Sequence, residues 1–342
     1  MGERLFARGS ACVILAVFAA SMAFAQSDDA TSGPIHGIFE QYFEADSSHK
    51  GVNGELSYIR LDADLDHGVK LVGSYVQMQD DQCLDELYAE IDRGRDIFKL
   101  GRFRSDFGFS TWSDLYYTPF VGLPMIRGYD RDIVPGISLD REDRGAEWES
   151  YIGPIQWQLA FVDSSDEDWQ IGPNIWDTGV GRVQVSAGPV LVGLNGFAKP
   201  SDQNGPSEQI VGLDLRWTGN RTEFRGEVDQ GVGHQGATGY YADFLYRPPH
   251  LARTQVGVRY QGIHSITSYD TGAYGAEVLP GGWGPGWAPA PHYSTAQVLT
   301  FAARQFLGPH FTLSVNYGTG TNSPQSVGLL GWSAQLLASY RF

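Results

Sequence analysis

Ionisable side chains are concentrated between residues 105 and 144, where carboxylates outnumber guanidinium groups. Charges of both signs on either side of a water-filled gap create a field that orients polar solutes and sorts them by charge. The segment therefore favours charge selection over bond-making chemistry. Its acidic residues are Asp106, Asp114, Asp130, Asp132, Asp140, Glu142 and Asp143, and its basic residues are Arg127, Arg131, Arg141 and Arg144.

A second group of arginines occurs in later segments whose residues alternate between apolar and polar. The alternation places these arginines on the polar face, where they form a candidate basic wall. Alternatively, neighbours such as Asp214, Glu223, Glu227 and Asp229 neutralise them, and they simply fill the wall. The arginines are Arg182, Arg216, Arg221, Arg225, Arg259 and Arg304.

Catalytic and cofactor motifs are not convincing in this sequence. Residues 231–236 match a dinucleotide-binding string, but they follow no buried strand and open no helix. The eight histidines are scattered without metal-ligand spacing, and no nucleophile motif is present. We expect no catalytic residue, no cofactor and no metal.

The N-terminal residues have the pattern of a secretory signal. Arg4 and Arg8 precede an apolar stretch at 11–24, and Ala23-Phe24-Ala25 is a small-residue cleavage site. We expect a signal peptide at 1–25 and one domain at 26–342, although the stretch could instead be a short membrane anchor. After cleavage Cys83 is the only cysteine, so no intramolecular disulfide can form.

Composition excludes two classes of protein. No later segment reaches the roughly 18 apolar residues of a membrane helix, which argues against a helical membrane protein. The net charge of −16 argues against a nucleic-acid partner.

The elements that must position the charged residues are strands with a period of two. From Trp332 to Phe342 every second residue is apolar or small, and Ser333, Gln335 and Arg341 lie between them. This alternation is typical of a strand with one face in lipid and one in water, although a soluble β-sandwich could show it. The C-terminal Phe342 resembles the signal by which assembly machinery recognises outer-membrane barrels.

Tight turns alternate with long polar connections along the chain, which predicts an antiparallel transmembrane β-barrel of about sixteen strands. Gly, Pro and Asn mark the tight turns. With both termini in the periplasm, every tight turn is periplasmic and every long connection external, and the segment after 105 is the third external loop. Fourteen or eighteen strands remain possible. The expected strands begin near Ile35, Gly54, Val69, Leu84, Asp96, Gly145, Ile155, Val180, Val190, Gln209, Arg221, Tyr240, Thr254, Thr295, Phe311 and Trp332.

The sequence KLGRFRSDFG at residues 99–108 resembles the segment that enters the third loop in the phosphate-selective family of outer-membrane porins. That family has sixteen strands and forms homotrimers, and in sixteen-strand porins the third loop folds into the barrel and narrows it. The resemblance therefore implies that Asp106, Asp114, Arg127, Asp130, Arg131 and Asp132 lie at a constriction, opposite the arginine wall. The chain departs from the family at Arg102, Arg104 and Asp106, and it has only four lysines, so phosphate specificity is not implied.

These observations favour an all-β porin that lets small hydrophilic solutes or ions diffuse passively across a bacterial outer membrane. Its expected partners are outer-membrane lipid and lipopolysaccharide, the barrel-assembly machinery through Phe342, and two further copies in a homotrimer. The alternatives are an outer-membrane barrel enzyme, such as a lipid hydrolase, and a structural or adhesin barrel blocked by its own loops.

Overall fold

The computed structural model describes residues 35–46, 53–65, 67–78, 82–105, 107–109, 117–122, 124–127, 142–163, 177–200, 208–232, 237–265, 295–321 and 330–341. The predicted signal peptide, Asp106, Asp114, Asp130, Arg131, Asp132 and Phe342 lie outside these ranges.

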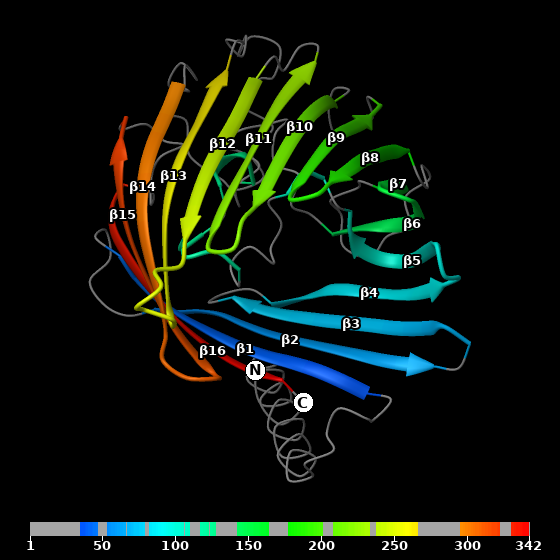
Figure 1. Cartoon of the computed structure of the whole chain (residues 1–342). Coiled ribbons are helices and arrows are strands. Elements are labelled where there is room, and N and C mark those ends of the chain that lie inside the picture. The colour runs from blue at the N-terminus through cyan, green and yellow to red at the C-terminus, as the bar shows by residue number, and fades with distance from the viewer. Residues whose placement is uncertain are drawn as a thin grey trace, which may run out of the picture.

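Sixteen antiparallel strands form one closed barrel, as the alternation predicts (Figure 1). Each strand pairs with the next along the chain, and β1 pairs with β16 to close the barrel. Closure satisfies every strand edge, which is the condition for crossing hydrocarbon with strands. The strands are β1 Ile35–Asp46, β2 Asn53–Leu65, β3 Val69–Met78, β4 Gln82–Asp92, β5 Asp96–Arg104, β6 Glu142–Ile152, β7 Ile155–Asp163, β8 Thr178–Ala187, β9 Val190–Lys199, β10 Glu208–Thr218, β11 Thr222–Val232, β12 Ala237–Tyr246, β13 Thr254–Ser265, β14 Thr295–Phe306, β15 Phe311–Gly320 and β16 Gly331–Arg341.

The two faces of the barrel wall differ in chemistry. On β10, Val211 and Leu213 are about half exposed on the outer face, whereas Asp214 between Leu213 and Leu215 is 1% exposed on the inner face. The same alternation exposes Phe224 and Val228 of β11 and buries Arg225 and Glu227. An apolar outer face and a charged inner face are typical of a barrel that meets lipid outside and water inside.

Tight turns join the strands at one end of the barrel. Gly94 and Gly153 have φ values of 81° and 60°, which glycine adopts without steric cost. These turns lie where Gly and Pro predict them, at the β4–β5 and β6–β7 connections. The longest connection, between β5 and β6, lies at the other end and contains the 3₁₀ helix η1 Met125–Arg127. Among the described residues, no helix is long and apolar enough to cross a membrane.

Candidate functional site

Apolar side chains of the wall surround the point where the connection leaves β5. Phe103 near the end of β5 and Phe107 at the start of the connection are 1% and 3% exposed, and both belong to one buried cluster with residues of six other strands. The burial of Phe107 stabilises the start of the connection, because it removes a large apolar surface from water. The other members are Val72, Tyr88, Ala160, Val162, Val180, Phe197 and Ile210.

The next residues form polar contacts with the inner wall. The Gly108 amide donates to Oδ1 of Asn195 at 3.1 Å, and the Phe109 amide donates to Oε2 of Glu227 at 3.1 Å. The guanidinium of Arg182 lies 5.1 Å from the centre of the Phe109 ring, within the range of a cation–π interaction. The connection therefore contacts β8, β9 and β11 soon after it leaves β5.

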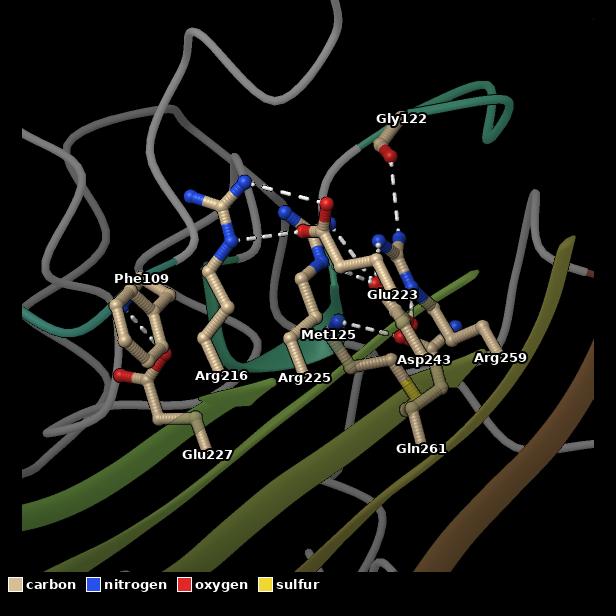
Figure 2. A network of polar contacts seen from close by, with 10 residues as sticks. All are labelled: Phe109, Gly122, Met125, Arg216, Glu223, Arg225, Glu227, Asp243, Arg259 and Gln261. Carbon is tan, nitrogen blue, oxygen red and sulfur yellow. Dashed lines mark hydrogen bonds and ion pairs between the residues drawn. The ribbon is translucent and has the colours of Figure 1, made fainter. Parts of the chain in front are cut away.

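Arg259 of β13 is the centre of the most extensive contact between wall and connection (Figure 2). Its Nε and Nη2 donate to the two carboxylate oxygens of Asp243 at 2.8 and 3.0 Å. Its Nη1 donates to the carbonyl oxygen of Gly122 at 3.3 Å, and its Cζ lies 4.0 Å from the centre of the Phe120 ring. Arg259 is only 2% exposed, so the connection covers it.

Asp243 accepts from a second arginine as well. Nε and Nη2 of Arg225 donate to Oδ2 of Asp243 at 2.9 and 2.8 Å, and Arg225 is 4% exposed. A carboxylate that receives bonds from two guanidinium groups is held in a fixed position, since these bonds are both charged and directional. The cluster is therefore a rigid support for residues 120–122.

Neutral groups hold the same part of the connection on either side of Arg259. The Met125 amide donates to Oε1 of Gln261 at 2.9 Å, and Nδ2 of Asn316 donates to the Val121 carbonyl oxygen at 3.2 Å. Phe120 packs with Leu245 and Ala302, and Met125 packs with Ile263, Ala296 and Val298. The described pieces of the connection thus lie against inner-face side chains from β8 to β15.

The inner face of β2 to β5 carries charged side chains that are more accessible. Arg60 is bonded to Asp62 at 3.0 Å and to Glu86 at 3.3 Å, and its side chain is 30% exposed. Lys70 pairs with Glu90 at 2.9 Å and is 36% exposed. These side chains are partly exposed, whereas Arg225 and Arg259 are buried.

The arginines of the predicted basic wall lie in different environments. Arg182 pairs with Asp214 at 3.2 Å, and Arg216 pairs with Glu223 at 3.0 Å with its side chain 44% exposed. Nε of Arg304 donates to Oγ of Ser314 at 2.8 Å, and Arg304 is 1% exposed. Arg221 lies exposed in the turn between β10 and β11.

The expected gap between connection and arginines is not found at Arg182 and Arg259, because both contact the connection directly. The physical reason is that aromatic rings and backbone carbonyls of the connection attract guanidinium groups. Four wall arginines also have carboxylate partners, as the neutralisation alternative proposes. The expected acidic partners of the connection lie outside the described residues, as does the side chain of Arg127.

Sequence reasoning missed Asp243, Gln261 and Arg60. Asp243 sits at an inward position of β12, between the strands that carry Arg225 and Arg259, so the alternation together with the strand order could have identified it. In the described ranges, no group of three or more His, Cys, Asp or Glu side chains could hold a metal ion.

Comparison with known proteins links the chain to solved barrels by shape alone. No protein-family model and no curated protein matches the sequence. Among solved structures, Salmonella typhi OmpF in complex with daunomycin superposes with a TM-score of 0.60 at 10% identity, over 90% of this chain and 97% of that chain. The anion-selective porin from Comamonas acidovorans superposes with a TM-score of 0.56 at 11% identity, over 90% of this chain and 98% of that chain. A mutant of Rh. blastica porin superposes with a TM-score of 0.55 at 10% identity, over 90% of this chain and 99% of that chain. The chain therefore has the closed sixteen-strand barrel fold of outer-membrane porins.

Proposed function

We propose that this chain is an outer-membrane porin, a water-filled channel through which small hydrophilic solutes or ions diffuse passively, without chemistry or cofactor. The observation that carries the proposal is the closed sixteen-strand barrel with an apolar outer face and a charged inner face. Side chains cannot fill the interior of so wide a barrel, so water occupies what the loops leave open. The similarity to solved porins supports the fold on which this inference depends.

The connection between β5 and β6 forms the constriction in this proposal. Its contacts with β8 to β15 support a course along one side of the interior, which leaves the opening beside β1 to β5. Arg60 and Lys70 then border the opening together with their carboxylate partners. The acidic residues Asp106, Asp114, Asp130 and Asp132 are the proposed counter-charges on the connection, with Arg127 and Arg131 beside them. Arg182, Arg216, Arg225, Arg259 and Arg304 support the wall and the connection.

The membrane setting is part of the same proposal. The signal peptide at 1–25 is removed, the domain at 26–342 enters the outer membrane with both termini in the periplasm, and lipopolysaccharide surrounds its outer end. Assembly machinery recognises the last strand through Phe342, and three copies associate. Deletion of Phe342 is expected to lower the amount of folded barrel in outer-membrane fractions, whereas Phe342→Tyr keeps an aromatic end and preserves it.

Planar-bilayer recording of residues 26–342 in a salt gradient tests the channel. Stepwise conductance in triplets is expected for a trimeric porin, and the reversal potential gives the sign of ion selectivity. Protein that inserts in the folded form without conductance would contradict the open channel and favour a barrel blocked by its loops. Release of fatty acid from added phospholipid would instead favour a lipid hydrolase.

A further inference from the structure

Charged side chains form a row across the inner face of β2 to β6, which are neighbours in the wall (Figure 1). They face inward because they alternate with outward residues such as Leu65 and Leu71. The strand registers place each charged residue directly opposite the next one, and the sign of the charge alternates from strand to strand. We call this set the charged row, and its members are Asp64 of β2, Lys70 of β3, Glu90 of β4, Lys99 of β5 and Glu147 of β6.

Only one end of the charged row is accessible. The side chains of Asp64 and Lys70 are 51% and 36% exposed, whereas those of Lys99 and Glu147 are 15% and 1% exposed. Asp64 lies one residue before the end of β2, and Lys70 lies one residue after the start of β3. The accessible end therefore lies beside the tight β2–β3 turn, at the mouth that the proposed function places in the periplasm.

Asp64 and Lys70 bind partners on opposite sides. Oδ2 of Asp64 lies 3.3 Å from Nε2 of His36 on β1, and Nζ of Lys70 donates to Oε1 of Glu90 at 2.9 Å. The structure describes both side chains, and they form no ion pair with each other although their positions are directly opposed. An acid and a base thus face the interior side by side, each held by a neighbour on its far side.

Both groups can bind a solute without giving up these partners. A lysine ammonium has about three donor positions and a carboxylate has about four acceptor positions, so one bond leaves capacity for others. Lys70 also carries its charge on a flexible stem, which lets the ammonium adjust to a second acceptor. Exposed ion pairs contribute little to stability, so such an adjustment costs little.

The alternation of signs determines which class of solute fits the accessible end. An anion at Lys70 is repelled by Asp64 and Glu90, which flank it on both sides. A cation at Asp64 is repelled by Lys70 on the neighbouring strand. A solute that carries a carboxylate and an ammonium close together avoids both repulsions, because each of its charges lies against the opposite charge of the wall.

From this arrangement we propose that the accessible end of the charged row binds small zwitterions of the α-amino acid type. The solute carboxylate accepts from Nζ of Lys70, and the solute ammonium donates to the carboxylate of Asp64. Opposed side chains on neighbouring strands have Cβ atoms about 5 Å apart, which suits two charged groups carried on one carbon. The inference names a solute class for the proposed channel and rests on that function, because solutes must reach the inner wall.

Saturation-transfer NMR of the folded protein in detergent tests this site with three solutes of similar size. L-Alanine carries both charges, ethylamine lacks the carboxylate and propionate lacks the ammonium. We expect L-alanine to bind about fivefold more tightly than either, since each of the others lacks one exposed ion pair. Lys70→Gln and Asp64→Asn should each abolish this preference. The control Arg95→Gln removes an exposed base from the β4–β5 turn, at the same end of the barrel but outside the charged row, and should keep it.

The three solutes and the variants separate the alternatives. Equal binding of L-alanine and ethylamine would reveal a cation site, and equal binding of L-alanine and propionate would reveal an anion site; either result would overturn the proposal. An unchanged preference in Lys70→Gln or in Asp64→Asn would do the same, because the zwitterion would then bind elsewhere. Binding at equilibrium needs no conductance. Protein that prefers L-alanine without conducting would contradict the porin proposal alone, and protein that conducts without this preference would contradict the zwitterion site alone.

Discussion

Arginines on two sides of the inner wall differ in what covers them. Arg259 of β13 is 2% exposed beneath the β5–β6 connection, whereas the side chain of Arg60 on β2 is 30% exposed. Both pair with carboxylates, Arg259 with Asp243 and Arg60 with Asp62 and Glu86. Their difference shows that an inward arginine is buried where the connection covers it, and in the proposed channel only the uncovered arginine is accessible to solutes.

Burial also determines how strongly dissolved salt weakens the ion pairs on each of these two sides of the inner wall. Ion pairs that are removed from water are screened little by dissolved salt, whereas exposed charges are screened over roughly 10 Å at 0.1 M. Substitutions on the covered side should therefore change the position of the connection at any ionic strength. Substitutions on the accessible side should change ion selectivity mainly at low salt.

The largest effect is expected for Arg259→Gln. The substitution removes the bond to the Gly122 carbonyl oxygen, the contact with Phe120 and one of the two arginine partners of Asp243. Breaking a buried ion pair costs about 3 kcal/mol, and Arg225 remains to compensate part of this loss. We expect a lower unfolding temperature in detergent and a larger, noisier single-channel conductance.

Arg225→Gln is the matched control for Arg259→Gln. It removes the other guanidinium from Asp243 but keeps the contacts of Arg259 with Gly122 and Phe120. We expect a similar loss of stability with a smaller change in conductance. Equal conductance changes in the two variants would show that Arg259 does not hold the connection.

Gly257→Ala is expected to lower the single-channel conductance, whereas Arg259→Gln raises it, and the change should be smaller. The new methyl group would lie 2.8 Å from Cγ of Pro119 and 3.0 Å from Cζ of Phe120, so the connection must move away from β13. Overpacking of this kind costs about 1 kcal/mol at its lower end. The displaced connection should narrow the opening and lower the single-channel conductance. A conductance equal to that of the parent protein would place the opening elsewhere.

On the accessible side, Arg60→Gln should shift selectivity towards cations. The change leaves Asp62 and Glu86 without this guanidinium, so the local charge becomes more negative. A unit charge about 8 Å away in water contributes on the order of 0.5 kcal/mol, which corresponds to roughly a twofold change in the permeability ratio. Reversal potentials recorded in salt gradients near 0.1 M and near 1 M measure this change in the permeability ratio.

Arg259→Gln supplies the contrast in that experiment. The shift in reversal potential for Arg60→Gln should be largest at 0.1 M salt and small at 1 M salt. The reversal potential of Arg259→Gln should depend less on the salt concentration. A larger low-salt shift for Arg259→Gln than for Arg60→Gln would reverse the assignment of the two sides.

The strand count and the tight turns could be predicted because they depend on local patterns. Alternation such as Val211, Leu213 and Leu215 around Asp214 depends only on which face each residue occupies. Turn positions such as Gly94 and Gly153 depend on backbone conformations that glycine favours. Both signals are complete within about ten residues, so no knowledge of distant contacts is needed.

The partners of the wall arginines were harder to predict, because they depend on strand register and on the course of a long connection. The pairing of Arg259 with Asp243 follows from the β12–β13 register. The contact of Arg259 with Gly122 joins residues 137 positions apart and has no signal in either local sequence. The inward direction of the wall arginines was therefore predictable from the sequence. Which of them the β5–β6 connection buries could be determined only from the structure.

The smallest effect is expected for Arg221→Gln, which tests whether every arginine of the predicted wall matters. Arg221 lies exposed in the β10–β11 turn, and its carbonyl oxygen accepts a bond from the Arg247 amide at 2.9 Å, which any residue at position 221 can form. Exposed charges contribute less than about 0.5 kcal/mol to stability. Conductance, unfolding temperature and reversal potential should all match the parent protein. A shift in reversal potential as large as that of Arg60→Gln would mean that solutes are selected at the turn end of the barrel, because Arg221 has no access to the covered side.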